Sequence, residues 1–161
     1  MSVTTAFWRI AADTPSYEAT DLSGKGAETS GGRWNRRGTP LLYASGSRAL
    51  ACLETLVHLG NSLPLNRYLV ELMVPAAALQ AAVTFDAQAH VGWDAEPAGR
   101  VSLDWGTAWA TSRRSLLAWV PSVVVPEEWN LLINPLHPEM ANLAAAKTRK
   151  WLYDPRLAGA A

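Results

Sequence analysis

The chain has 161 residues, of which 49% are hydrophobic and 17% charged, so it can bury one sizeable core and is not intrinsically disordered. Fourteen Lys and Arg residues balance fourteen Asp and Glu residues, which gives no general attraction for nucleic acid or a membrane surface. We therefore expect a single compact domain over residues 1–161, with a core from about residue 7 to residue 153.

Cysteine usage and apolar segments indicate the compartment. The only cysteine, Cys52, cannot form an internal disulfide, and its place among apolar residues predicts an inert core thiol. The first residues do not resemble a signal peptide, and no stretch approaches the roughly 20 apolar residues of a membrane span. These features favour a cytoplasmic protein without membrane contact.

The first half of the chain predicts strands at residues 7–12, 41–44 and 67–74. A long polar loop over residues 13–32, with at most one helical turn, separates the first two strands. A helix is predicted from about Ser47, as its N-cap, to about Leu59, with Gly60 closing it at C′.

The second half predicts a short helix over residues 76–82 and a longer one from Ser102 or Asp104 to about Trp119. Strands are predicted at residues 83–86, 121–126, 129–134 and 145–153, and residues 90–100 are rich in turns. Because strands and helices follow no regular βαβ rhythm, the fold class is α+β with mixed or antiparallel sheets.

Common metal and nucleotide signatures are missing from the sequence. His58, His90 and His137 lie far apart and have no partner at ligand spacing, so structural roles are favoured for all three. There is no GxGxxG motif and no P-loop. We expect no metal and no bound cofactor.

Arg33 stands out within the segment from residue 31 to residue 54, which begins GGRWN. Two glycines let the backbone turn sharply before it, and a guanidinium binds a pyrophosphate or carboxylate in a bidentate manner. The alternative is a structural salt bridge within the turn, and the spacing does not decide between the two.

Tyr43 and Glu54 follow in the same segment. Tyr43 ends a strand just before a helix, a place that often borders a cleft, although a core aromatic is the more frequent outcome. Glu54 has apolar neighbours on its helix, where a carboxylate needs a partner. That partner is His58 or Arg48 if Glu54 has only a structural role.

Four further polar positions are candidates for ligand contacts or for fold-supporting roles. Ser122 precedes a β-branched run, and the amides of Asn130 and Asn134 flank Leu131–Ile133 and need partners if buried. Arg9 sits inside an apolar strand, from which a charged side chain points to solvent or to a cleft. The basic residues Lys147, Arg149 and Lys150 are interpreted as charges that protect an edge strand.

Taken together, the motifs FWRI, GGRWN, LLYAS, ALACLE and VPSVVVPEEWNLLINPLHP, in this order, resemble the RES-domain family over roughly residues 7–153. The resemblance implies a toxin of a bacterial toxin–antitoxin system, partnered by a helix-turn-helix (Xre-like) antitoxin. It also implies a fold related to ADP-ribosyltransferases that acts on NAD+ as substrate. Nucleic acid is expected to be contacted only through the antitoxin, and a homodimer is left open.

The resemblance assigns catalytic roles to Glu54, Arg33 and Tyr43. It implies substrate contacts for Arg9, Arg33, Tyr43 and Ser122, and we expect Asn130 to be a further substrate contact. Ser122 matches the family serine through its PS step, ahead of Ser112 and Ser115.

The expected reaction is NAD+ cleavage at the nicotinamide–ribose bond, by hydrolysis or phosphorolysis. Glu54 would stabilise the oxocarbenium-like transition state, and Arg33, with Arg9, would hold the pyrophosphate. Alternatives are an ADP-ribosyltransferase for one cellular protein and a non-catalytic interaction module with Arg33 and Glu54 as an ion pair. A nucleic-acid enzyme ranks last because of the balanced charge.

Overall fold

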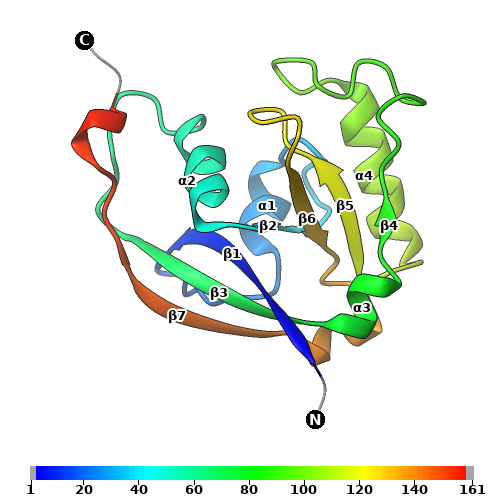
Figure 1. Ribbon diagram of the computed structural model, residues 1–161, viewed down its shortest axis with the longest axis horizontal. Helices are drawn as coiled ribbons and strands as arrows, with labels where there is room; N and C mark the ends of the chain where they lie inside the picture. The colour runs from blue at the N-terminus through cyan, green and yellow to red at the C-terminus, as the bar shows by residue number, and fades with distance from the viewer. Residues whose placement is uncertain (1–2, 159–161) are drawn as a thin grey trace.

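A seven-stranded mixed sheet forms the framework of the protein, for which a computed structural model describes residues 3–158. The strand order is β4-β5-β6-β2-β1-β3-β7, and all neighbours are antiparallel except β4 and β5 (Figure 1). The strands are β1 (Thr4–Ala12), β2 (Leu42–Ser45), β3 (Arg67–Pro75), β4 (Val83–Thr84), β5 (Leu117–Pro121), β6 (Trp129–Ile133) and β7 (Ala144–Trp151).

The sheet divides between β1 and β2. Strand β1 pairs with β3 along its whole length, from Thr4 opposite Pro75 to Ala12 opposite Arg67. Its register with β2, by contrast, consists of the single pair Trp8 and Ser45. The strands therefore form a β1–β3–β7 half and a β2–β6–β5–β4 half that meet at one point and diverge from it.

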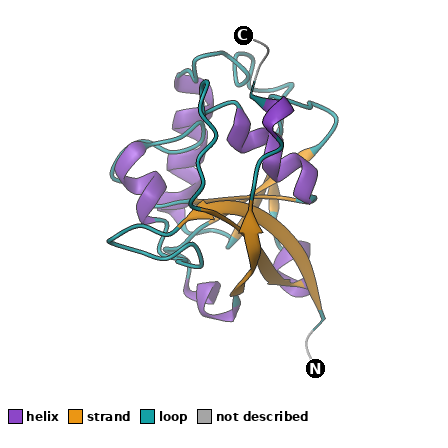
Figure 2. Cartoon of the chain, turned by 90° about the vertical axis from the view of Figure 1, so that its left-hand side faces the viewer, coloured by secondary structure: helices purple, strands orange, loops and turns teal. Residues whose placement is uncertain are grey.

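The helices are short and lie around the strands rather than in one layer (Figure 2). They are α1 (Lys25–Ser30), α2 (Arg48–Leu56), α3 (Ala76–Gln80) and α4 (Arg100–Ser112), with 3-10 turns η1 (Pro138–Asn142) and η2 (Pro155–Leu157). Helix α2 begins as its sequence predicts, since the Ser47 hydroxyl accepts the Leu50 N–H at 3.1 Å.

Each half of the sheet carries its own hydrophobic packing. Helix α2 packs its buried residues against β1 and β3, in a cluster of Trp8, Ile10, Ala51, Cys52, Leu69 and Tyr153. Helix α4 packs on the other half, in a cluster that joins Trp109 and Ala110 to Trp34, Phe85, Val120 and Leu132. A third cluster joins the strands of both halves. Apolar burial thus fixes α2 and α4 on either side of the divergence.

The α+β class is confirmed, and most predicted strands lie within a few residues of the observed ones. Lys147, Arg149 and Lys150 do lie on an edge strand, because β7 ends the sheet order. Cys52 is buried in α2, and burial raises the pKa of its thiol, which agrees with an inert core residue.

Two predicted elements were wrong. The helix expected through Trp119 is α4, which ends at Ser112, where Arg113 adopts a left-handed conformation with φ of 53°. Its predicted last residues form β5, and the strand expected at residues 121–126 is a turn after Pro121. A continuous apolar run bounded by turns does not distinguish helix from strand.

The other errors are smaller. Helix α2 stops at Leu56, three residues before the predicted end, so Gly60 belongs to the following loop and does not close the helix at C′. Strand β4 covers only Val83 and Thr84 of the predicted residues 83–86. Within residues 3–158, no helix is long and apolar enough to cross a membrane.

Candidate active site

A large cleft opens where the two halves of the sheet diverge. Its volume is about 1300 Å³, and it is lined by β1, β2, α2, the 24–37 segment and the loop before α4. Five of the six predicted site residues line it, namely Arg9, Arg33, Tyr43, Glu54 and Asn130. The sixth, Ser122, is fully buried just behind the wall.

Glu54 is held through a single carboxylate oxygen. Its Oε1 accepts from the Ser122 hydroxyl at 2.6 Å and from the Asn130 side-chain amide at 2.7 Å. Oε2 accepts no hydrogen bond from the part of the chain that is described. Glu54 is not bound to either structural partner expected from the sequence, Arg48 or His58. Arg48 instead lies over the Trp8 ring at 3.8 Å, and the Glu54 carboxylate is bound by neutral groups.

Ser122 connects Glu54 to the turn that follows β5. The serine Oγ accepts the backbone N–H groups of Val124 at 3.1 Å and Val125 at 3.0 Å while donating its own hydrogen to Glu54. This pattern stabilises a tight turn and explains why residues 122–126 do not continue as a strand. The predicted contact of Ser122 with a ligand stays a prediction, since its hydrogen is directed at Glu54 here.

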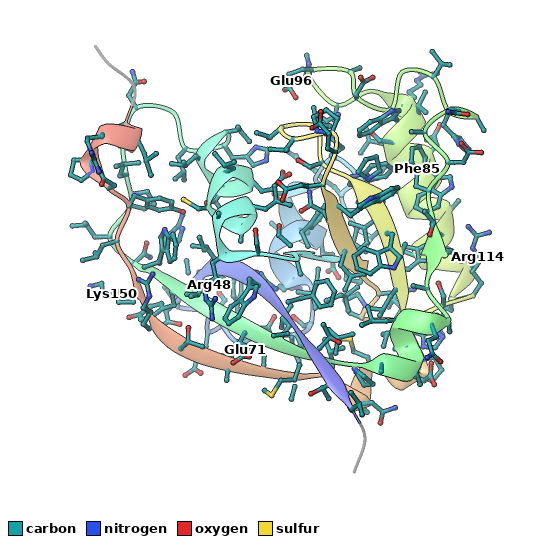
Figure 3. The ribbon with its side chains drawn as sticks, viewed as in Figure 1. Arg48, Glu71, Phe85, Glu96, Arg114 and Lys150 are labelled. Carbon is teal, nitrogen blue, oxygen red and sulfur yellow. The ribbon has the colours of Figure 1, made fainter. Side chains whose placement is uncertain are left out.

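Arg33 is engaged by the loop that precedes α4. Its Nη1 donates to the carbonyls of Trp93 and Ala95, at 3.2 and 2.8 Å, and its Nη2 pairs with the Glu96 carboxylate at 2.6 Å. Figure 3 shows Glu96 at the outer end of this loop, and the Glu96 side chain is 76% exposed. The salt bridge anticipated as an alternative therefore exists, but it reaches a distant loop rather than staying within the turn.

Tyr43 organises the GGRWN turn. Its hydroxyl donates to Asn35 Oδ1 at 2.5 Å and accepts the Trp34 N–H at 3.1 Å. Asn35 is itself fully buried, with its amide nitrogen bound to the carbonyls of Ala27, Arg36 and Thr39. Burial raises the pKa of Tyr43 well above its usual value, so the hydroxyl is a hydrogen-bonding group and not a base.

Two glycines let this turn pack closely. A Cβ on Gly32 would lie 2.5 Å from the Tyr43 hydroxyl oxygen. A Cβ on Gly106, in the middle of α4, would lie 1.9 Å from the carbonyl oxygen of Trp34. Glycine is required at both places because any side chain would separate the turn from β2 or from α4.

Arg9 offers the cleft an unused donor. Its Nη1 is buried and has no hydrogen-bond partner within residues 3–158. Burial lowers the pKa of Arg9, whereas the nearby Asp21 and Tyr17 raise it. The guanidinium remains charged throughout the ordinary pH range. An unpaired buried cation is costly, which points to an anionic ligand as its partner.

Four residues that support the site were missed from the sequence, namely Ser45, Glu96, Asn35 and Gly106. Two of them carried a usable signal: Asn35 ends the GGRWN motif, and glycine in the middle of a helical pattern, as at Gly106, indicates a packing requirement. Ser45 and Glu96 act through partners far away in the chain, Asn130 and Arg33, which local patterns do not reveal. Asn134, also considered, has a fold role, because its amide donates to Ala110 at 2.9 Å.

The cleft thus combines two kinds of charge. Arg9 and Arg33 supply cations for an anionic group, and Glu54 supplies a carboxylate with one oxygen open. Such an arrangement suits a ligand that is anionic along one part and becomes cationic at the reacting carbon. Among residues 3–158 there is no cluster of three or more His, Cys, Asp or Glu side chains that could hold a metal ion.

Comparisons with known proteins identify the family. The profile of the family described as "RES domain" matches residues 6–155. A relative from Sphingobium sp., named "Prs ADP-ribosylating toxin", is 60% identical over 157 residues, which cover 96% of this chain and 98% of the relative.

Two more distant relatives carry the name "Toxin Res". One from Yersinia enterocolitica is 38% identical and covers 88% of this chain and 93% of its own length. The other, from Pseudomonas putida, is 33% identical and covers 93% and 97% respectively. The match in each case extends over most of both chains.

Proposed function

The chain belongs to the RES-domain family, and from this premise we propose that it is a toxin enzyme that cleaves NAD+ and transfers ADP-ribose to a protein. The observation that carries the proposal is Glu54, a cleft carboxylate bound at one oxygen by two neutral donors with the other oxygen open. No cofactor enters the scheme, because NAD+ is the substrate.

The reaction begins with loss of nicotinamide. The bond between the ribose C1′ and the nicotinamide nitrogen breaks, its electron pair leaves with neutral nicotinamide, and positive charge develops on the ribose. A fixed carboxylate beside that carbon lowers the barrier, because it is already oriented when the charge appears. Glu54 takes this role, and an acceptor nucleophile then bonds to C1′ and gives up a proton.

The phosphates of NAD+ require cations. Arg9 is the first candidate, because its Nη1 is buried at the cleft wall without a partner. Arg33 is the second, and it reaches the phosphates with its remaining hydrogens or after Glu96 leaves. Two guanidinium groups match the two charges of a pyrophosphate.

Tyr43 and Asn130 complete the substrate site in this proposal. Tyr43 supports the turn that carries Arg33 and offers its ring to the nicotinamide side of the ligand. Asn130 and Ser122 hold the Glu54 carboxylate, and Ser122 acts from behind the wall because it is fully buried.

The acceptor is proposed to be a protein. The Sphingobium relative is named for ADP-ribosylation of Prs, and its identity of 60% over nearly the whole chain favours the same kind of acceptor here. Since relatives at lower identity are named "Toxin Res", we also propose a cognate antitoxin, of the helix-turn-helix class, that restrains the activity.

In the test, purified protein is incubated with NAD+ labelled in its adenine ring. Three reactions are compared: buffer alone, added phosphate, and the added Prs protein of the bacterium that encodes the chain. Transfer predicts that nicotinamide release is strongly stimulated by Prs and that label enters the Prs band. The matched control is Glu54→Gln, which keeps the side-chain shape and removes the charge. Products are identified by mass spectrometry.

Two results would contradict the proposal in different ways. Free ADP-ribose, or ADP-ribose 1″-phosphate in the phosphate reaction, at equal rates with and without Prs would replace transfer by hydrolysis or phosphorolysis. NAD+ left intact in every reaction would remove the enzymatic function and leave an interaction module.

A further inference from the structure

Strand β2 presents two side chains to the cleft, and one of them has no assigned role. Tyr43 and Ser45 are two residues apart on a strand, so they point to the same face, and both line the cleft. Tyr43 serves the GGRWN turn, whereas Ser45 is directed at β6. Ser45 is only 3% exposed, which makes its hydroxyl a buried polar group with a defined partner.

That partner is the amide of Asn130. Ser45 and Asn130 stand opposite each other in the β2–β6 register, and the Ser45 hydroxyl donates to Asn130 Oδ1 at 2.7 Å. The other end of the same amide, Nδ2, donates to Glu54 Oε1 at 2.7 Å. The three side chains form a chain of hydrogen bonds that runs from β2 through β6 to α2.

The direction of this chain follows from the carboxylate. An ionised carboxylate only accepts hydrogen bonds, so the Asn130 amide must turn its NH2 group toward Glu54. The amide oxygen then faces Ser45 and needs a donor, which the hydroxyl supplies. In the flipped orientation, the amide oxygen would lie beside the Glu54 oxygen and repel it.

We propose that Ser45 is a positioning residue for the reaction proposed above, and that it sets the Asn130 amide in the orientation that holds Glu54. Ser45 acts through Asn130 rather than on the substrate. With Oε1 fixed by Ser122 and Asn130, the open Oε2 is aimed at the ligand, and loss of one restraint leaves the carboxylate free to rotate away.

The kinetic test compares Ser45→Ala with the conservative variant Ser45→Thr in the full chain. Because small displacements of catalytic groups have large effects, Ser45→Ala is expected to lower kcat by roughly 10-fold to 100-fold with little change in KM for NAD+. Ser45→Thr keeps the hydroxyl and is expected to restore most of kcat. A rise in KM with kcat unchanged would overturn the proposal and make Ser45 a substrate contact.

A double-mutant cycle identifies the route of the effect. In an Asn130→Ala background the amide is gone, so Ser45→Ala is expected to add almost nothing. An equal loss in both backgrounds would overturn the proposal, since Ser45 would then act independently of Asn130. A kcat of wild-type size in Ser45→Ala would also overturn it.

A measurement without turnover separates this proposal from the proposed function. In 15N-labelled protein, the two amide hydrogens of Asn130 are expected to give a well-resolved pair of NMR signals that broaden or merge in Ser45→Ala. Unchanged signals would show that Ser45 does not hold the amide. If wild-type protein leaves NAD+ intact, the proposed function and the catalytic meaning of Ser45 fail together, and the NMR result still decides the contact.

Discussion

The two charged sides of the cleft are built in opposite ways. At the glutamate side, Glu54 is held by neutral donors and keeps one oxygen open. At the arginine side, the two terminal nitrogens of Arg33 are bound by two carbonyls and by the protein's own Glu96. One charge is ready for a ligand, and the other is largely neutralised by the chain itself.

This difference indicates which contacts a ligand can make without displacing a protein group. A ligand gains the interaction with Glu54 without displacing a protein group, because the site is preorganised. At Arg33 a phosphate competes with a carboxylate that is exposed and free to move into solvent. Arg9, proposed as the first anion contact, has an unpaired buried Nη1 and needs no such exchange.

The largest expected effect is at the glutamate side. Glu54→Gln retains the hydrogen bonds from Ser122 and Asn130 but removes the charge, so the fold is expected to persist while kcat falls by roughly 100-fold to 1000-fold. The measurement is nicotinamide release by single-turnover kinetics, with the melting temperature as the control for folding. Activity near that of wild type would transfer the catalytic role to another group.

The next effect concerns the support of the arginine side. Gly106→Ala would raise local helix propensity, but its Cβ would meet the Trp34 carbonyl oxygen, so we expect a destabilisation of about 1–3 kcal/mol. Urea unfolding measures it. Gly46→Ala is the matched control, because a Cβ on Gly46 meets nothing within 4 Å. A stabilised Gly106→Ala variant would show that α4 does not pack against the turn.

Arg33→Ala is expected to raise the Kd for NAD+ by roughly tenfold, since one of two guanidinium groups is lost. Calorimetric titration in a Glu54→Gln background measures binding without turnover. Arg149→Ala removes the same charge from the edge strand β7, where it faces Trp151 instead of the cleft, and is expected to leave the Kd unchanged. An unchanged Kd in Arg33→Ala would assign the phosphate contact to Arg9 or to another cation of the cleft wall, such as Arg67.

The smallest effect is at Glu96. Glu96→Gln removes the carboxylate that competes for Arg33, so the Kd for NAD+ is expected to fall by about 2-fold to 5-fold, in line with the modest energy of an exposed ion pair. The control is Glu71→Gln, which removes the same charge from β3, away from Glu96 in Figure 3 and outside the cleft. A higher Kd would mean that Glu96 supports the substrate site instead of competing with the substrate.

The sequence predicted which residues meet in the cleft better than it predicted what those residues contact. Arg33, Tyr43 and Glu54 occur in one short segment with recognisable turn and cap residues, so their convergence follows from local order along the chain. Their partners do not. Glu96 is 63 residues from Arg33, and Ser122 is 68 residues from Glu54. Such pairs are fixed by the tertiary fold, which no local pattern encodes.

The errors in the fold have a related cause. The apolar run that ends in β5 was interpreted as the end of a helix, because its length and composition suit either structure. The turn after it is held by backbone hydrogen bonds and by the hydroxyl of Ser122, which binds two backbone N–H groups and Glu54 at once. A structural role and a proposed catalytic role coincide there, and the residue type alone does not reveal either.

The single register pair between β1 and β2 has a genetic consequence. Ser45 is one member of that pair, and it also begins the hydrogen-bond chain that ends at Glu54. The seam of the sheet and the electrostatic support of the carboxylate therefore share a residue. A selection for harmless variants of this toxin is therefore expected to return substitutions at Ser45 as well as at Glu54.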